Sequence, residues 1–551
     1  MTVEVRSTFS LLDEAWIPCL MDDGSVESFG LKQVLAEATR VRDVVGELPT
    51  QTFAIVRLLL AILHRALGEE LETKRDWARL WSGGLPIAEA QEYLEEFRDR
   101  FDLLHPEQPF YQVAGLRTAK DEVKGVSALL FDVPPNFRLF TGRAGTALDG
   151  LSYAEAARWL LHAHAYDVSG IKSGLVGDDR VKGGKGYPIG TGWCGELGGL
   201  LIEGTNLAET LMLSLVPRTG RDAYQDVPPW ERPPDTAAAR NHENPRGSVD
   251  LFTWQSRRIR LVDDGSRVTG CVVGNGDKIT PQNRYAIEPL TAWRFSKPQT
   301  QKNKGMPVFM PRVHRSEYMF WRGISGLTVQ RVESGAASGP PAGFAPPVIA
   351  WLVELQVEGY LPMTQPIAPR AIGVEYGTQN SVVVNLVDDR LTVLLSALDA
   401  EGHPELSAAA RAAVAAAEMA VGELAKFAGN LALAAGGNAE GPRERAREEG
   451  FSTLDMPFRS WLRQLGGDPA SSPEGHLDRW KDTVRELVTR LGSAEVDASG
   501  SSAWQGRMVR LSAGERLINT SLAERWFHSG LRRALARLAD EGAHEHDGEK
   551  E

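Results

Sequence analysis

One stretch of the chain combines residue types that could bind a phosphate backbone. Residues 182–192 read K-G-G-K-G-Y-P-I-G-T-G, with five glycines and two lysines in eleven residues. Glycine destabilises the interior of helices and strands, but its lack of a Cβ lets a backbone pass very close to another surface. The stretch is therefore either a loop that lies against a nucleic acid or a flexible connector between two elements.

This region partly matches two nucleotide-binding motifs, but it lacks features that each motif requires. Residues 190–195 have the glycine spacing of a dinucleotide fingerprint, but Tyr187–Pro188 precedes them and a strand-like run follows them, where a strand and then a helix are needed. Gly184–Lys185 resembles the end of a P-loop, yet Gly186 replaces the magnesium-binding Ser or Thr. An enzyme with a phosphate or nucleotide site in Gly177–Gly195 is the alternative hypothesis.

Few other residues have the spacing of a catalytic or metal site. His162 and His164 are two residues apart in a predicted helix, so they face different sides and are poor co-ligands. Cys19, Cys194 and Cys271 have no C-x-x-C neighbour, which argues against a disulfide framework and a cysteine zinc site and fits a reducing cytoplasm. Neither G-x-S-x-G nor H-E-x-x-H occurs. We therefore expect no catalytic residues, no cofactor and no metal.

The charge distribution limits how the chain could bind DNA. The net charge is −12 over 551 residues, whereas a free-standing DNA-binding protein is usually basic because neutralising phosphates drives its affinity. Residues 278–322 hold nine Lys or Arg against two acids, which gives this segment a charge of +7. Contact with a nucleic acid would therefore occur through a local patch, or within an assembly that supplies further positive charge.

No segment is typical of a membrane span or a targeting signal. The longest apolar run, Phe53–Leu63, is interrupted by Arg57 and is shorter than the about 18 residues of a spanning helix. Residues 1–10 are polar and charged, unlike a signal peptide. We expect a cytoplasmic protein with no membrane partner.

The elements that must position the glycine run are irregular and mixed. Residues 1–388 are expected to form a large mixed α/β domain, which begins with a hairpin that turns at Asp22–Gly24. Ser152 and Glu155 form a capping box, and Asn206 is a second helix cap. Helices are predicted at 31–41, 50–67, 86–104 and 156–165, and strands at 197–203, 348–360 and 372–384 and in the β-patterned region that starts at L-F-T-W-Q (251–255).

The last third of the chain has a different, alanine-rich composition. Residues 389–551 are expected to form a four-helix bundle with an acidic tail, and the overall fold class is α+β. The predicted helices are 404–435, 453–465, 473–491 and 521–539, with a charged loop at 442–449 and a capping box at Ser521 and Glu524.

These features in this order resemble the large subunit (CasA family) of the type I-E CRISPR surveillance complex, Cascade. The resemblance covers nearly the whole chain, including the Phe131 loop, the glycine run and the terminal bundle. The motifs that carry it are F-S-L-L-D-E-A-W-I-P (9–18), A-I-V-R-L-L-L-A-I-L (54–63), H-P-E-Q-P-F-Y-Q (105–112), L-F-T-W-Q (251–255) and Y-G-T-Q-N (376–380).

The resemblance implies a non-catalytic subunit that inspects double-stranded DNA for a protospacer-adjacent motif and then recruits a helicase-nuclease. It implies other Cascade subunits and the 5′ end of a guide RNA as further partners. A scaffold whose bundle docks partner subunits is a third hypothesis. The implied site residues are the glycine loop Gly183, Gly184, Lys185 and Gly186, the wedge Gln379 with Asn380, the basic finger Arg284 with Lys278 as the other candidate, and the guide-RNA and subunit loop with Phe131, Asn136, Arg138 and Arg143.

Overall fold

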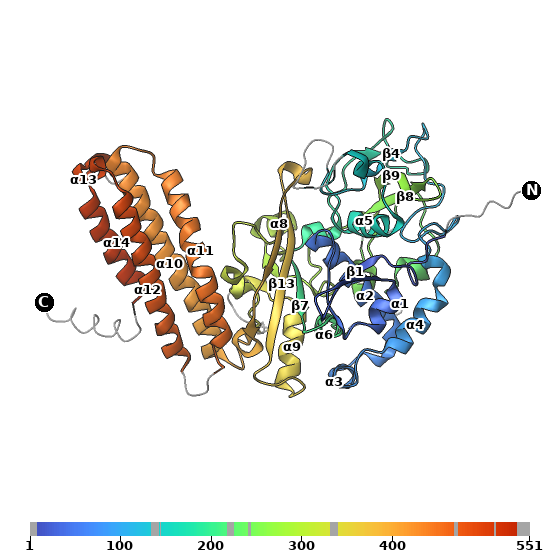
Figure 1. Cartoon of the computed structure of the whole chain (residues 1–551), viewed down its shortest axis with the longest axis horizontal. Coiled ribbons are helices and arrows are strands. Elements are labelled where there is room, and N and C mark those ends of the chain that lie inside the picture. The colour runs from blue at the N-terminus through green and yellow to red at the C-terminus, as the bar shows by residue number, and fades with distance from the viewer. Residues whose placement is uncertain are drawn as a thin grey trace, which may run out of the picture. The chain divides into compact units, whose positions relative to one another are not determined.

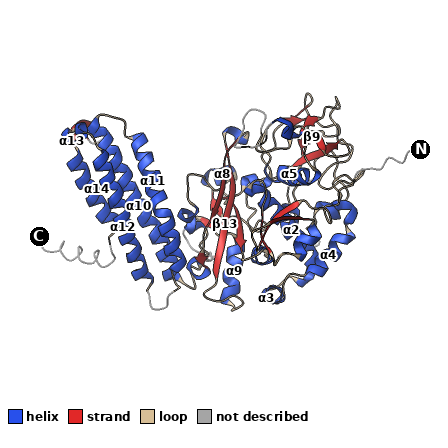
Figure 2. Ribbon diagram, viewed as in Figure 1, coloured by secondary structure: helices blue, strands red, loops and turns tan. Residues whose placement is uncertain are grey.

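The computed structural model describes residues 8–133, 141, 143, 145–217, 225–240, 244–330, 340–467, 472–511 and 514–536. Contacts divide the chain into two compact units (Figure 1). Unit 1 lies within residues 1–318, 332–361 and 367–390, and unit 2 lies within 319–331, 362–366 and 391–551. The predicted α+β fold, mixed in its N-terminal part and helical at the C-terminal end, is confirmed (Figure 2).

Unit 1 begins with the predicted hairpin. Strands β1 (Ile17–Met21) and β2 (Val26–Phe29) are antiparallel, and β3 (Val41–Val44) pairs with the other edge of β1. Gly24 has φ 86° in the turn, where Asp23 Oδ1 accepts a hydrogen bond of 2.8 Å from the Ser25 amide. The helix predicted at 31–41 is shorter, α1 (Leu31–Ala36), because the chain must turn into β3.

Helix α2 (Pro49–Leu67) is the core helix of unit 1. Its composition and length would suit a membrane span, but 89% of its apolar window is buried inside the protein, as in the core helix of a globular domain. Arg57 is 1% exposed and forms two hydrogen bonds of 2.9 Å with Glu288, which is fully buried. Trp193 Nε1 donates to the same carboxylate at 2.8 Å. Each charge is therefore paired within the core, as burial requires.

Two of the other helices of unit 1 begin at the caps that the sequence predicts. Ser152 and Glu155 form the expected capping box of α5, and Asn206 caps α6 through the Glu209 amide. The helix predicted at 86–104 divides into α4 and a short 3-10 turn at Arg98–Phe101. The bounds are α3 (Lys74–Gly83), α4 (Ile87–Glu96), α5 (Tyr153–Tyr166), α6 (Leu207–Ser214), α7 (Ser248–Phe252), α8 (Lys297–Lys302) and α9 (Pro347–Val357).

Short antiparallel sheets carry the loops of unit 1. The longest strand, β13 (Pro366–Tyr376), pairs with β7 (Gly199–Glu203) through residues 368–372 and with β14 (Val383–Arg390) through residues 370–376. A second sheet has β9 at its centre, and a third has β10 at its centre. The remaining strands are β4 (Lys124–Gly125), β5 (Lys172–Ser173), β6 (Lys185–Gly186), β8 (Arg257–Asp263), β9 (Val268–Asn275), β10 (Trp293–Phe295), β11 (Phe309–Pro311) and β12 (Gly343–Phe344).

Two predicted β-segments of unit 1 are wrong. L-F-T-W-Q overlaps helix α7, whose N-terminal amides of Val249 and Asp250 donate to the Asp226 carboxylate at 3.1 and 2.8 Å. This cap comes from a distant part of the chain, so the local sequence does not reveal it. The strand predicted at 348–360 is mostly helix α9, which spans Pro347–Val357, because an apolar run without clear periodicity fits either element.

Unit 2 is a helical bundle around α10 (Pro404–Ala435), which packs against α11 (Glu440–Gln464), α12 (Pro473–Ala498) and α14 (Thr520–Ala534) (Figure 1). The charged loop predicted at 442–449 is wrong, because α11 begins before it and continues through Pro457. Asn519 caps α14 in place of the predicted capping box at Ser521 and Glu524. Helix α13 (Ser501–Gln505) and the hairpin β16 (Arg507–Leu511) and β17 (Gly514–Ile518) have no counterpart in the prediction.

Candidate nucleic-acid interface

The predicted glycine loop is the end of a tight hairpin. Lys182 and Lys185 exchange backbone hydrogen bonds of 3.1 and 3.2 Å, and the two residues between them, Gly183 and Gly184, have φ 59° and 72°. Positive φ at both central positions defines a type I′ turn, which strongly favours glycine. All four of these residues are exposed, and we call residues 182–185 the glycine tip.

Close backbone packing holds the base of this hairpin. Strand β6 pairs with β5, with Lys172 opposite Gly186. A Cβ on Gly174 would lie 2.5 Å from the carbonyl atoms of Gly184, and one on Gly186 would lie 2.9 Å from Asn275 Nδ2. Of the four predicted loop residues, Gly183, Gly184 and Lys185 are exposed to solvent. Gly186 is buried, so it belongs to the support of the tip.

The predicted wedge is also the end of a hairpin. Strands β13 and β14 are joined through residues 377–382, which we call the wedge turn, and Gln379 and Asn380 have φ 57° and 54° there. Both side chains are exposed, and Gln379 forms no side-chain hydrogen bond with any residue that the structure describes. A left-handed backbone is uncommon for glutamine and costs conformational energy that a glycine here would not pay. The turn nevertheless carries a glutamine, whose side-chain amide is exposed and unpaired.

The fold brings the glycine tip and the wedge turn to one region. The Ser169 amide donates a hydrogen bond of 2.8 Å to the Asn380 carbonyl. Ser169 lies three residues before Lys172 of β5, which pairs with the hairpin of the glycine tip. Three extended residues span at most about 11 Å. The sequence places the two turns almost 200 positions apart, and only the structure shows that they share this support.

The two candidates for the basic finger have different surroundings. Lys278 is exposed and forms no ion pair within the described part of the chain, and it follows Asn275 by three residues. Asn275 Nδ2 donates to the Tyr187 carbonyl at 2.6 Å, directly beside the glycine hairpin. Arg284 is half-buried and donates to Thr280 and Asn244, and burial lowers its pKa. Lys278 is therefore the free cation of the pair.

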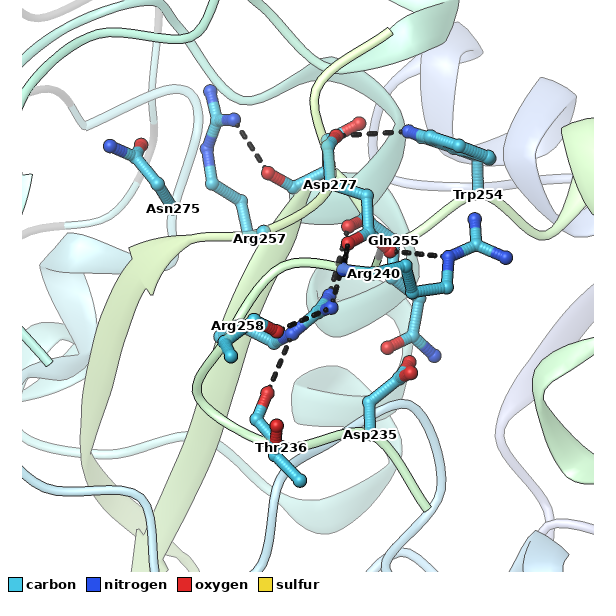
Figure 3. A network of polar contacts seen from close by, with 12 residues as sticks. Asp235, Thr236, Arg240, Trp254, Gln255, Arg257, Arg258, Asn275 and Asp277 are labelled. Atoms are coloured by element: carbon cyan, nitrogen blue, oxygen red, sulfur yellow. Dashed lines mark hydrogen bonds and ion pairs between the residues drawn. The ribbon is translucent and has the colours of Figure 1, made fainter. Parts of the chain in front are cut away.

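Buried ion pairs hold Asp277, which lies two residues past the end of β9 and directly before Lys278 (Figure 3). Asp277 is 1% exposed and accepts hydrogen bonds of 2.8 Å from both Arg240 and Arg258, while Trp254 Nε1 donates to its carbonyl at 3.0 Å. Burial alone would raise the pKa of Asp277, but the two guanidinium groups lower it below its usual value. The chain beyond β9 is thus anchored at Asp277 by two buried guanidinium groups, and the next residue, Lys278, is exposed.

The residues predicted for the guide-RNA loop are only partly described. The Phe131 side chain is buried, with its ring 4.7 Å from that of His162 and 6.3 Å from that of Tyr376. Arg143 forms ion pairs with Glu47 and Glu155. Phe131 and Arg143 therefore make contacts within unit 1, and Asn136 and Arg138 lie outside the described residues.

Three side chains near the two turns were missed by sequence reasoning. Ile171 and Tyr187 are 57% and 55% exposed and flank the paired residues Lys172 and Gly186, so continuing the register places them opposite each other. Arg257 is fully buried under the same region. The signal for Arg257 is the R-R-I-R run of β8, because consecutive arginines in a buried strand require internal acceptors.

The geometry of a nucleotide site is not found at the glycine run. Residues 190–196 lead into a single 3-10 turn (Trp193–Glu196) and then into β7, so no helix N-terminus faces the glycines. Within the described ranges, no three His, Cys, Asp or Glu side chains group as a metal site. His162 and His164 are both buried in α5, and burial lowers the pKa of each to about 3.

Comparisons with known proteins agree with this fold. The sequence profile of the family described as CRISPR-associated protein Cse1 matches residues 10–491. A curated relative, CRISPR-associated protein CasA/Cse1 of Thermus thermophilus, is 34% identical over 327 residues, which cover 58% of this chain and 60% of the relative. The match therefore spans less than two thirds of that relative.

Solved structures are similar over nearly the full length. The crystal structure of Thermobifida fusca Cse1 is 41% identical, covers 97% of this chain and 99% of its own, and has a TM-score of 0.87. Cse1 of Acidimicrobium ferrooxidans is 26% identical, covers 98% of this chain and 99% of its own, and has a TM-score of 0.78. A chain of a CRISPR RNA-guided surveillance complex shares the fold at 19% identity, with a TM-score of 0.62 over 89% of this chain and 99% of its own. The resemblance inferred from the motifs is confirmed, and this chain belongs to the Cse1 (CasA) family of CRISPR-associated proteins.

Proposed function

We propose that this chain is the non-catalytic large subunit of a type I-E CRISPR surveillance complex. It recognises the protospacer-adjacent motif of double-stranded DNA from the minor groove and starts to unwind the target. The observation that carries this proposal is the pairing of two exposed left-handed turns: the Asn380 carbonyl accepts the Ser169 amide, three residues before the strand that supports the glycine tip. Family membership and the surveillance-complex chain of the same fold add support.

The charges at these turns suit a nucleic acid. Lys182, Lys185 and Lys278 are exposed and unpaired among the residues described, so their positive charge is available to phosphates. The chain as a whole carries −12, which keeps its independent affinity for DNA low. A subunit with a small basic patch on an acidic body binds DNA briefly and depends on other subunits for retention.

The two turns suit two steps of the same process. The minor groove displays a nearly degenerate pattern, so its readers rely on groove shape and close approach, and the glycine tip has no side chains at its two central positions to prevent that approach. The Gln379 amide then enters beside the motif and separates the first base pairs, which costs a few kcal/mol per step. Guide pairing takes over sequence reading once the strands are open.

The proposed partners are the other subunits, the 5′ end of the guide RNA, the target duplex and a helicase-nuclease. The segment from Phe131 to Gly150 is the proposed guide-RNA and subunit contact. The bundle of unit 2 is the proposed region for docking of further proteins. We propose a cytoplasmic location and no catalytic activity of the chain itself.

The test measures duplex opening by the complex assembled with its guide RNA. A fluorescent adenine analogue in the first base pair after the motif reports the opening rate. Gln379→Ala should slow opening by about tenfold or more, because the wedge no longer supplies part of the unstacking energy. Gln33→Ala, which truncates an exposed glutamine on α1, should leave the rate unchanged.

A second pair of variants tests the glycine tip. Gly184→Ala places a side chain at φ 72° on the approaching surface, and it should weaken motif-dependent binding. Gly24→Ala introduces the same strain at φ 86° in the exposed β1–β2 turn, so it controls for backbone effects. Unchanged opening in both Gln379→Ala and Gly184→Ala would overturn the proposal.

The other hypotheses have separate tests. Saturable binding or turnover of ATP or NAD by the purified chain would favour the nucleotide-binding enzyme. A complex whose DNA affinity is the same with and without this chain would favour the scaffold.

A further inference from the structure

We infer that Arg257 is a positioning residue that couples the glycine tip to the wedge turn, so that the two turns move as one body. The consequence for DNA rests on the proposed function above, whereas the coupling itself concerns only the folded chain. Nothing in the family comparison assigns a role to this residue.

Arg257 lies fully buried at the start of β8, and its guanidinium joins two separate segments of the chain. Nε donates to the Asp167 carboxylate at 2.5 Å, and Nη2 donates to the carbonyls of Asp167 and Val168 at 3.2 and 3.0 Å. The same Nη2 donates to the Gly190 carbonyl at 2.9 Å. One side chain therefore holds residues 167–168 against the far end of the glycine hairpin.

Each of these segments leads directly to one of the two turns. Val168 is followed by Ser169, whose amide holds the Asn380 carbonyl at 2.8 Å. Gly190 is four residues after β6, which carries the glycine tip. Lys172 adds a second contact, with Nζ 2.6 Å from the Asp167 carboxylate. The Arg257 side chain therefore adds a buried side-chain link between the two turns, beside the backbone link from Ser169 through the pairing of β5 and β6.

The neighbouring Arg258 shows that this role is specific to one position. Side chains alternate along a strand, and Arg258 points to the other side, where it donates to the Thr236 and Ala238 carbonyls and to Asp277 (Figure 3). Arg258 forms no hydrogen bond or ion pair with residues 167–190, all of which the structure describes. The two buried arginines thus support different parts of unit 1, and of the two only Arg257 joins residues 167–168 to Gly190.

The chemistry of the bridge requires a guanidinium. Arginine presents five donors in a planar fork, so it can bind a carboxylate and several carbonyls at fixed angles. Lysine carries the same charge on one nitrogen with three donors and can keep the Asp167 pair, but it cannot also reach Gly190 with that geometry. Arg257→Lys therefore removes the bridge while it keeps the buried charge paired.

The first experiment measures the coupling in the free chain. Lys182→Cys and Ser381→Cys place spin labels on the two turns, and the three native cysteines are buried, which disfavours their labelling. We expect a narrow distance distribution in the parent, a broad one in Arg257→Lys, and a narrow one in Arg370→Lys. Arg370 is a matched control, because its side chain is 6% exposed and pairs with Asp388, Glu203 and Asp43 instead.

An unchanged distribution in Arg257→Lys overturns the inference. If this variant does not fold, Asp167→Asn replaces it, because the amide removes the charge that orients the guanidinium and preserves the side-chain volume. A distribution as narrow as that of the parent in Asp167→Asn likewise overturns the inference.

The second experiment measures the coupling on DNA in the assembled complex. In the parent, the effects of Gly184→Ala and Gln379→Ala on the opening rate should be non-additive, with the double variant about tenfold faster than the product of the single effects predicts. In the Arg257→Lys background the two effects should multiply independently. Independent effects in the parent would overturn the coupling and leave the proposed function intact. Single variants without any effect would overturn the proposed function, and the coupling would then stand on the label distances alone.

Discussion

In unit 2, α10 is held by alanines that repeat at helical spacing and let three other helices approach closely. In unit 1, the segments beside the glycine tip and the wedge turn are held by hydrogen bonds from buried side chains, among them Arg257 to Gly190 and Asn275 to Tyr187. The first arrangement follows from a local pattern, and the second depends on partners from distant parts of the chain. The exposed turns of the candidate interface are supported by buried polar groups in the segments beside them.

The largest expected effect concerns the buried charge of unit 1. Arg57→Met leaves Glu288 buried without its cation, which should destabilise unit 1 by about 3–5 kcal/mol. Hydrogen exchange of the full chain checks this, because peptides from α2 and α10 report the two units separately. Loss of protection in α2 with α10 unchanged is expected. A cost under about 1 kcal/mol would show that unit 1 does not depend on buried ions.

The matching change in unit 2 removes apolar packing. Trp480 is buried, packs against Phe458 and Trp461, and donates to the Ala413 carbonyl at 2.9 Å. Trp480→Ala should cost unit 2 about 3–5 kcal/mol, through the cavity and the unpaired carbonyl. Trp480→Phe keeps much of the packing and should cost less. Hydrogen exchange should now show lost protection in α10 and unchanged protection in α2. Equal losses of protection in both helices would show that the two units do not unfold separately.

The sequence predicted the bundle well, because its information is local. The bounds of α10 agree with the prediction at both ends, since a proline at the start and a glycine after the end mark them. The candidate interface was predicted only as separate residues. The sequence suggested that the glycines serve close approach to a ligand. The structure gives a more immediate reason for Gly183 and Gly184, because both have a positive φ that favours glycine. That Ser169 joins the two turns depends on tertiary contacts that no local pattern encodes.

Acid should affect unit 1 through its buried histidines. Burial lowers the pKa of His162 and His164 to about 3 and that of His314 to about 4, below the about 6.5 of the unfolded chain. Protons therefore bind the unfolded state first, so their contribution is complete above pH 6.5 and is lost as the pH falls toward 3–4.

Each histidine should change the free energy of unfolding by up to about 1.4 kcal/mol per pH unit in that range. Urea unfolding between pH 7 and 5 measures the slope. His164→Gln keeps a donor near the Tyr111 carbonyl, and it should reduce the slope by the share of one histidine. If the slope does not change in this variant, His164 does not contribute to it, which contradicts the prediction that this histidine binds a proton only in the unfolded chain.

The smallest expected effect on stability separates fold from function. Gln379→Gly removes the strain of a positive φ in the folded state, but it also gives the unfolded chain more backbone freedom. These two effects on the free energy of unfolding should nearly cancel, within about 0.5 kcal/mol. The melting temperature of unit 1 checks this. A large loss would mean that the glutamine holds the wedge turn together and is not mainly a ligand-facing residue.

The most direct test of the central claim is the opening rate of the first base pair in complexes that carry Gln379→Gly. The fold should be intact and the turn unstrained, so any change reports the missing amide. We predict that the duplex still binds and that strand separation slows by about tenfold or more. Strand separation at the parental rate, with the duplex bound normally, would contradict the account.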